Sequence, residues 1–154
     1  MTETEAKKIL LLESINKALN SIKALLHSAD KILPFKPDKT YSLDELEPYD
    51  ALTSRFERAV EVCINKLFRS IQYYETGAKE GTIRDTLNLM IKLDIIEDTE
   101  QWMNMRDIRN RITHDYLPEK LAQIYVEITE KYIAYFKSLQ KKLKHYLKQK
   151  DINE

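Results

Sequence analysis

Glycine and cysteine are both scarce in this 154-residue chain. The two glycines, Gly77 and Gly81, fall in one short turn. The chain therefore lacks the loops that cradle phosphates in many nucleotide-binding folds, G-x-x-x-x-G-K-[ST] and G-x-G-x-x-G. Cys63 is the single cysteine, which excludes an internal disulfide framework and a cysteine-based zinc site and suits a reducing compartment.

The chain also lacks net charge and long apolar runs. Its 25 Lys and Arg residues balance 25 Asp and Glu residues, so the protein as a whole is not a polycation built to grip a duplex nucleic acid. No apolar run approaches the roughly 20 residues of a membrane span. Residues 1–6 are polar and acidic and show no secretory signal. We therefore expect a cytoplasmic protein without membrane segments.

The length predicts a single domain over residues 1–154, because domains average roughly 150 residues. Apolar residues make up 43% of the chain, which is enough for one core. We expect an irregular connection at 32–48, where the helical membership of residues 43–48 stays open, and a polar tail at 149–154.

Apolar residues recur every three or four positions, as in amphipathic helices. Thr82 suits the N-cap of a short helix, Thr99 could open the next one, and Pro118 should break that one. The sequence predicts an all-α, up-and-down bundle that also dimerises, with four main helices and one short helix. These helices cover approximately residues 4–31, 52–77, 83–91, 99–116 and 118–148.

The densest polar chemistry lies in residues 106–116, which read Arg-Asp-Ile-Arg-Asn-Arg-Ile-Thr-His-Asp-Tyr. On an ideal helix, with roughly 100° per residue, a core stripe beside Trp102 consists of Met105, Ile108 and Ile112. The opposite face is polar and carries Asp107, Asn110 and His114. Because Asn110 and His114 are neighbours on that face, the amide can orient the imidazole.

Arg109 lies at the edge of the apolar stripe, roughly 140° from His114 on the same helical wheel. A half-buried arginine needs an anionic partner. Two arrangements satisfy this need. Either Arg109 pairs with an acid on another helix, or the helix end unwinds and brings Arg109 and His114 into one cleft.

Other reactive or aromatic residues have simpler interpretations. His27 and His145 are expected to be surface or packing residues, and Cys63 a small core residue. The tyrosines of the last helix are expected to form a packing seam and dimer contacts, with RNA stacking as the alternative. The lysines of 137–150 are expected to form a solvated helix end, with contact to a polyanion as the alternative. His114 itself could be only a favourable charge at a helix C-terminus.

The element Arg109-x4-His114-x-Tyr116, with Asn110 after the arginine, resembles the signature of HEPN-domain proteins. Within that family it most resembles the HepT-type toxins. The placement also fits, because the motif lies on a late helix that precedes one long terminal helix. The architectural resemblance covers approximately residues 49–148.

The resemblance implies a toxin that is a metal-independent endoribonuclease without a cofactor. It implies Arg109 and His114 as catalytic residues and Asn110 as a supporting polar group. It also implies a cognate minimal nucleotidyltransferase (MNT) antitoxin that attaches AMP to Tyr116. Cleavage of RNA by its own 2′-hydroxyl needs a base, an acid and a cation. Since one protomer offers one suitable histidine, the mechanism also predicts a homodimer.

Two other functions fit the same residues. A related group of four-helix proteins partners nucleotidyltransferases as presumed substrate-binding subunits without being nucleases. The element Arg109-x4-His114-x-Tyr116 favours the toxin, whereas the neutral total charge argues against strong RNA affinity, which depends on cationic contacts with phosphates. The third possibility is a purely structural adaptor bundle.

Overall fold

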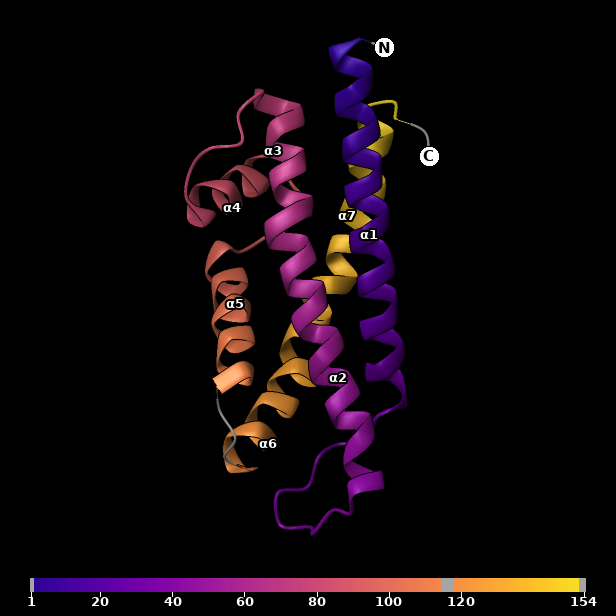
Figure 1. The fold of residues 1–154 in the computed structure, drawn as a ribbon, viewed down its shortest axis with the longest axis vertical. Helices are drawn as coiled ribbons and strands as arrows, with labels where there is room; N and C mark the ends of the chain where they lie inside the picture. The colour runs from indigo at the N-terminus through magenta and orange to yellow at the C-terminus, as the bar shows by residue number, and fades with distance from the viewer. Residues whose placement is uncertain (1, 115–117, 153–154) are drawn as a thin grey trace.

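The computed structural model describes residues 2–114 and 118–152, with the side chains of residues 113, 118 and 119 left out of the description. Every regular element in these ranges is a helix, and no strand occurs among them. The long helices run up and down the molecule, with the start of α1 and the end of α7 at the same end (Figure 1). The prediction of an all-α helical bundle is therefore confirmed.

Helix α1 spans Glu3–Lys31 and begins at a capping box: the Glu5 amide donates to the Thr2 hydroxyl, and the Thr2 amide donates to the Glu5 carboxylate. Its apolar stripe is fully buried against α2, η1, α3 and α7. The core residues of this stripe are Leu11, Ile15, Ala18, Ile22 and Leu25. The helix ends at Lys31, before Pro34, in agreement with the predicted range.

Helices α2 (Leu43–Glu61), η1 (Val62–Leu67, with π-helical bonding) and α3 (Phe68–Thr76) follow one another without a break in helical backbone. Ser42 and Glu45 form a capping box that starts α2, so helix replaces the expected irregular backbone at residues 43–48. The capping box satisfies the first amides, and Pro48 removes a single backbone donor inside the helix. The irregular connection is therefore residues 32–42.

Gly77 ends α3 with φ of +75°, a left-handed conformation that favours glycine at this position. Helix α4 (Ile83–Lys92) starts at Thr82, as predicted. Helix α5 (Thr99–His114) differs in its cap, because the Asp98 carboxylate accepts the amides of residues 100 and 101. The Thr99 hydroxyl instead donates to Asn88 at 2.8 Å and ties α5 to α4.

The last part of the described chain consists of α6 (Pro118–Glu127), η2 (Ile128–Tyr132, π-helical) and α7 (Ile133–Gln149). These bounds agree with the predicted helix at 118–148. The expected polar tail is wrong in one respect, because Ile152 is buried at 7% exposure. After α7 the chain turns back, and the Ile152 amide bonds the carbonyl of Leu147. This turn lets an apolar side chain return to the core.

Aromatic rings join the layers at the centre of the bundle. Trp102 of α5 lies 5.1 Å from the ring of Phe68 on α3 and 5.4 Å from that of Phe136 on α7, both edge to face. Phe136 in turn contacts Phe56 of α2. All four side chains are fully or almost fully buried. They hold α5 in a fixed orientation against the α2–α3 rod and α7.

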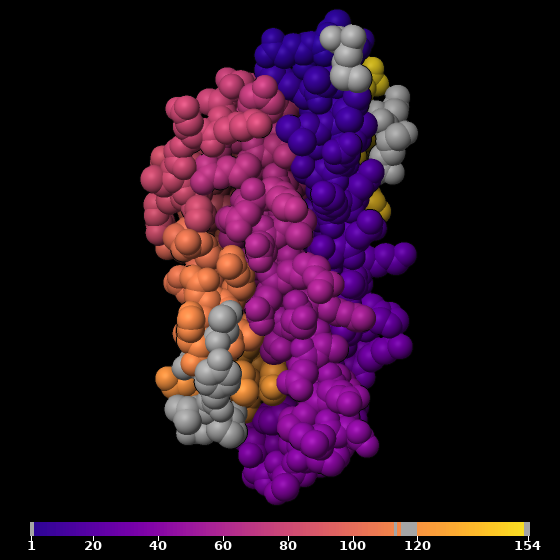
Figure 2. Space-filling model, in the orientation of Figure 1, coloured from indigo at the N-terminus to yellow at the C-terminus, as the bar shows by residue number. Residues whose placement is uncertain are grey.

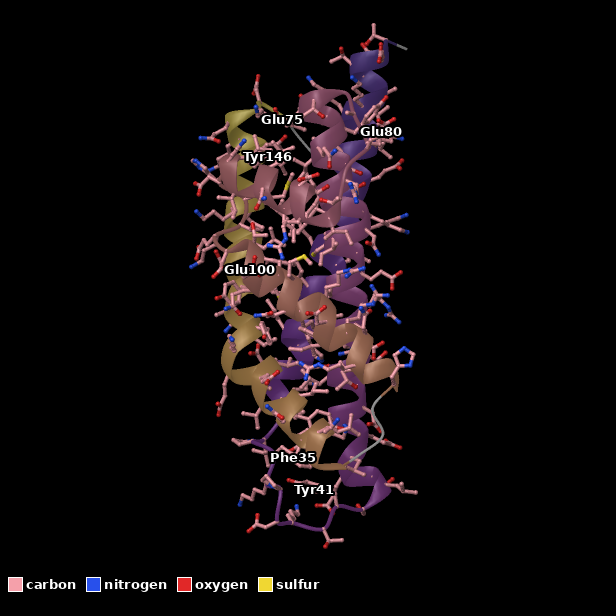
Figure 3. The ribbon with its side chains drawn as sticks, turned by 90° about the vertical axis from the view of Figure 1, so that its left-hand side faces the viewer. Phe35, Tyr41, Glu75, Glu80, Glu100 and Tyr146 are labelled. Atoms are coloured by element: carbon pink, nitrogen blue, oxygen red, sulfur yellow. The ribbon has the colours of Figure 1, made fainter. Side chains whose placement is uncertain are left out.

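The tyrosines of the last helical segment pack inside the protomer. Tyr125, Tyr132 and Tyr146 are each at most 5% exposed, so the expectation of a dimer seam with hydroxyls in water is wrong for these three. The Tyr146 hydroxyl donates to Glu75 at 2.7 Å. Both residues are labelled near one end of the bundle in Figure 3. These three tyrosines therefore pack against the chain's own helices.

A second aromatic cluster closes the opposite end of the bundle, where Phe35 and Tyr41 are labelled in Figure 3. These two rings stack at 4.7 Å, and Phe35 also contacts Tyr49 and Tyr125. The Tyr49 hydroxyl donates to the carbonyl of Leu33 at 2.7 Å. Burial is the main reason that the pKa of Tyr49 rises to about 12. The connection 32–42 is thus anchored on the core.

The Phe136→Ala variant should lower the free energy of unfolding by about 3 to 5 kcal/mol, because it leaves a cavity beside the rings of Phe56 and Trp102. Urea unfolding followed by far-UV circular dichroism measures this change. Leu43→Ala is the control, since Leu43 is 84% exposed and its loss should stay within about 0.5 kcal/mol. Equal effects of the two substitutions would contradict the central role of the aromatic layer.

Candidate functional site

Helix α5 carries the polar segment singled out by the sequence, and it stays helical through His114. The predicted stripe is confirmed: Trp102, Met105 and Ile108 are buried, and Ile112 is partly buried against the core. Asp107, Asn110 and His114 are exposed on the other side. Burial of one face therefore turns the polar face of α5 outward.

Arg109 is half-buried and lies electrostatically close to Glu57 of α2, the helix against which α5 packs. Desolvation is the main cause that raises the pKa of Glu57, and the positive charge of Arg109 opposes this rise. Glu57 is thus an acid on another helix that lies close enough to Arg109 for their charges to interact. The helix does not unwind before His114.

Arg109 and His114 diverge within one protomer. They are five residues apart on a regular helix, which separates their directions by roughly 140°. Arg109 faces α2, whereas His114 is exposed at the C-terminal end of α5. A single chain thus does not bring the two side chains together in its described residues. Tyr116 lies outside the residues that the structure describes.

Asn110 lies in a polar groove of about 660 Å³ between α5 and the α6–η2 segment. Four residues of α5 form one wall, and η2 with the end of α6 supplies the other. His114 is not among the described residues of this lining, which are Asn104, Asp107, Asn110, Arg111, Glu127, Lys131 and Tyr132. The groove therefore collects one of the predicted site residues and several that sequence reasoning did not assign to a site.

The groove is electrically balanced. Asp107 and Glu127 supply two carboxylates, while Arg111 and Lys131 supply two cations. The two walls influence each other across the gap, because Arg111 lowers the pKa of Tyr132 while burial, the largest cause, raises it. Sequence reasoning missed the second wall because residues 127–132 are far from α5 along the chain and only the fold places them opposite it.

The remaining candidates agree with their simpler interpretations. Cys63 is fully buried, and burial raises the pKa of its thiol. His27 and His145 are both exposed. Within residues 2–114 and 118–152, no group of three or more histidine, cysteine or acidic side chains could hold a metal ion. Among the described helices, none is long and apolar enough to cross a membrane.

The described residues form an all-α helical bundle, in which the polar helix α5 precedes one long terminal helical segment. Residues 10–145 match the model of the family described as nucleotidyltransferase substrate binding protein like. This match spans most of the chain, and the protein therefore belongs to that family. Comparison with curated proteins gave no match.

Replacing Arg109 with Met should raise the pKa of Glu57 further, because the substitution removes the one charge that lowers it. The folded-state pKa of Glu57 already lies above its usual value. Its contribution to stability is therefore present at low pH and is lost as the pH rises through that pKa. The Arg109→Met variant should show a larger loss of stability over the same rise.

Carbon-13 NMR titration of the Glu57 carboxyl measures this shift directly. Arg58→Met is the matched control, since Arg58 follows Glu57 on α2, is exposed, and does not contribute to the pKa of Glu57. An unchanged Glu57 pKa in Arg109→Met, or an equal shift in both variants, would contradict the pairing of α5 with α2 through these two groups.

Proposed function

We propose that this protein is the partner subunit of a nucleotidyltransferase, which it binds through the polar end of α5 and the groove beside it. The observation that carries the proposal is the family match over residues 10–145. The description of that family, nucleotidyltransferase substrate binding protein like, implies association with a nucleotidyltransferase. This is the alternative that the neutral charge of the chain also favours.

The electrostatics of the groove support a protein partner over a polyanion. Two carboxylates and two cations line the groove, so it offers no net attraction to a phosphate backbone. Mixed charges at a rim instead orient a protein partner and select against wrong ones. Asp107, Asn110 and Arg111 are exposed, and each side chain is available to a second protein without disturbing the core.

The test is binding to a nucleotidyltransferase from the same genome, measured by isothermal titration calorimetry and co-elution. Arg111→Glu should raise the dissociation constant of the complex by about tenfold or more, because it places an unmatched carboxylate in the groove. Lys137→Glu is the control, since Lys137 is exposed on α7, away from the groove. Lack of any complex with the candidate enzymes, or equal weakening by both substitutions, would overturn the proposal.

A second candidate function is the metal-independent endoribonuclease of a toxin–antitoxin pair. The observation that favours it is the order Arg109, Asn110 and His114 on one helix, with His114 exposed at the helix end. An exposed imidazole can act as a general base or a general acid. In this candidate function, an MNT antitoxin neutralises the toxin by attaching AMP to Tyr116, which adds negative charge beside the site.

The nuclease chemistry requires a homodimer, because each chain contributes one histidine at this place. One His114 takes the proton of the ribose 2′-hydroxyl, whose oxygen attacks phosphorus. The other gives a proton to the departing 5′-oxygen, which leaves a 2′,3′-cyclic phosphate. Arg109 would stabilise the added charge on the phosphoryl oxygens.

RNA cleavage in EDTA distinguishes the two functions. If the chain is the nuclease, it should cut total RNA or tRNA, and His114→Ala should lower the rate by about 100-fold or more. Arg109→Ala should have a similar effect, while His145→Ala, which removes an exposed histidine of α7, should leave the rate unchanged. No cleavage by protein whose mass excludes AMP attachment would reject the nuclease and leave the binding subunit.

A further inference from the structure

A second groove, of about 670 Å³, lies on a different face of the molecule, between α1 and the η1–α3 segment. The two walls are side by side in Figure 1, near the end where α1 begins, and Figure 2 shows α1 in indigo against the magenta rod. None of the residues that line this groove belongs to α5, and none was predicted from the sequence as a site residue. Its volume is in the range of pockets that hold small organic ligands.

The groove concentrates positive charge in a chain whose net charge is zero. One carboxylate, that of Glu13, faces four cationic side chains, which are Lys17, Lys66, Arg69 and Lys79. These cations come from α1, η1, α3 and the turn after α3, so folding brings them together. Like charges gathered in this way repel one another, and a bound anion relieves that repulsion.

Two of these four cations remain available to a ligand. Lys17 and Lys66 are exposed and form no ion pair among the described residues, although Glu13 is four positions before Lys17. Arg69 is different, because it donates to the carbonyl of Gly81 and to the Thr86 hydroxyl, and so fixes the turn that carries Lys79. Arg69 therefore supplies charge and a rigid wall.

Hydroxyl groups and an aromatic ring complete the groove. The hydroxyls of Ser14 and Ser70 bond each other at 2.6 Å. This pair uses one of its two hydrogens and leaves the other to donate to a ligand oxygen. Tyr73 adds an aromatic surface, with the Lys79 ammonium 4.6 Å from its ring centroid, and Leu10 adds an apolar edge. The lining thus offers donors for an anion and an apolar surface for an organic group.

We propose that this groove binds a small phosphorylated organic anion of nucleotide size. Lysine ammonium groups and a free hydroxyl match phosphate oxygens, which accept hydrogen bonds and carry the charge that the groove lacks. Tyr73 and Leu10 would contact the organic part. The site is separate from the surface of α5 and needs neither a partner enzyme nor nuclease activity, so it stands or fails independently of the proposed function.

Isothermal titration calorimetry of the full chain with three probes tests the site. ATP and tripolyphosphate, both without metal, should bind, and their affinity should fall as salt rises, because the contacts are ionic. Adenosine, which lacks phosphate, should bind much more weakly. The Lys17→Gln/Lys66→Gln variant should weaken ATP binding by about tenfold or more, given two lost charge-assisted contacts.

The matched control is Lys137→Gln/Lys141→Gln, which removes two exposed lysines of α7 outside the groove. This control should bind ATP within about twofold of the unchanged chain. Circular dichroism checks that both variants fold, as expected for surface positions. The proposal is overturned if none of the probes binds, if both double variants weaken ATP binding equally, or if adenosine binds as tightly as ATP.

Discussion

Burial of the aromatic layer around Trp102 is the constraint on which the rest of this structure depends. Its ring lies edge to face with Phe68 and Phe136, so one side chain of α5 is packed against two of the long helical segments. Removing several aromatic faces from water stabilises the fold by several kcal/mol in total. The same contacts leave α5 a single rotation, with Met105 and Ile108 inside and Asp107, Asn110 and His114 outside. The candidate site is a consequence of this packing.

Arg109 shows how the same rotation separates residues that are close in sequence. It is half-buried and its charge acts on Glu57 of α2, the helix against which α5 packs. His114, five residues on, is exposed. A nuclease built from these two residues therefore needs a second copy of the chain. A binding subunit does not, and the family match and the balanced groove support it as the leading proposal.

The zero net charge of the chain conceals two grooves that differ in charge. The groove beside α5 contains equal numbers of carboxylates and cations, whereas the groove between α1 and α3 is strongly cationic. Most lysines in 137–150, the obvious basic run in the sequence, remain exposed, while Lys142 and Lys150 form ion pairs with Asp94 and Glu75. The cationic groove between α1 and α3 thus consists of residues that are far apart in the sequence and form no run of like charges.

The sequence by itself determined the helical elements and the inward face of each one, because apolar spacing and capping residues act over three or four positions. It identified Thr82 as a cap and the stripe of α5, and it missed the capping box at Ser42 and the Asp98 cap. Only the tertiary structure decided that Glu57 faces Arg109, that residues 127–132 form the second wall of the polar groove, and that Lys17 and Lys66 share a pocket. Those pairs are separated by long stretches of chain, so their contact depends on how whole helices pack, which local periodicity does not encode.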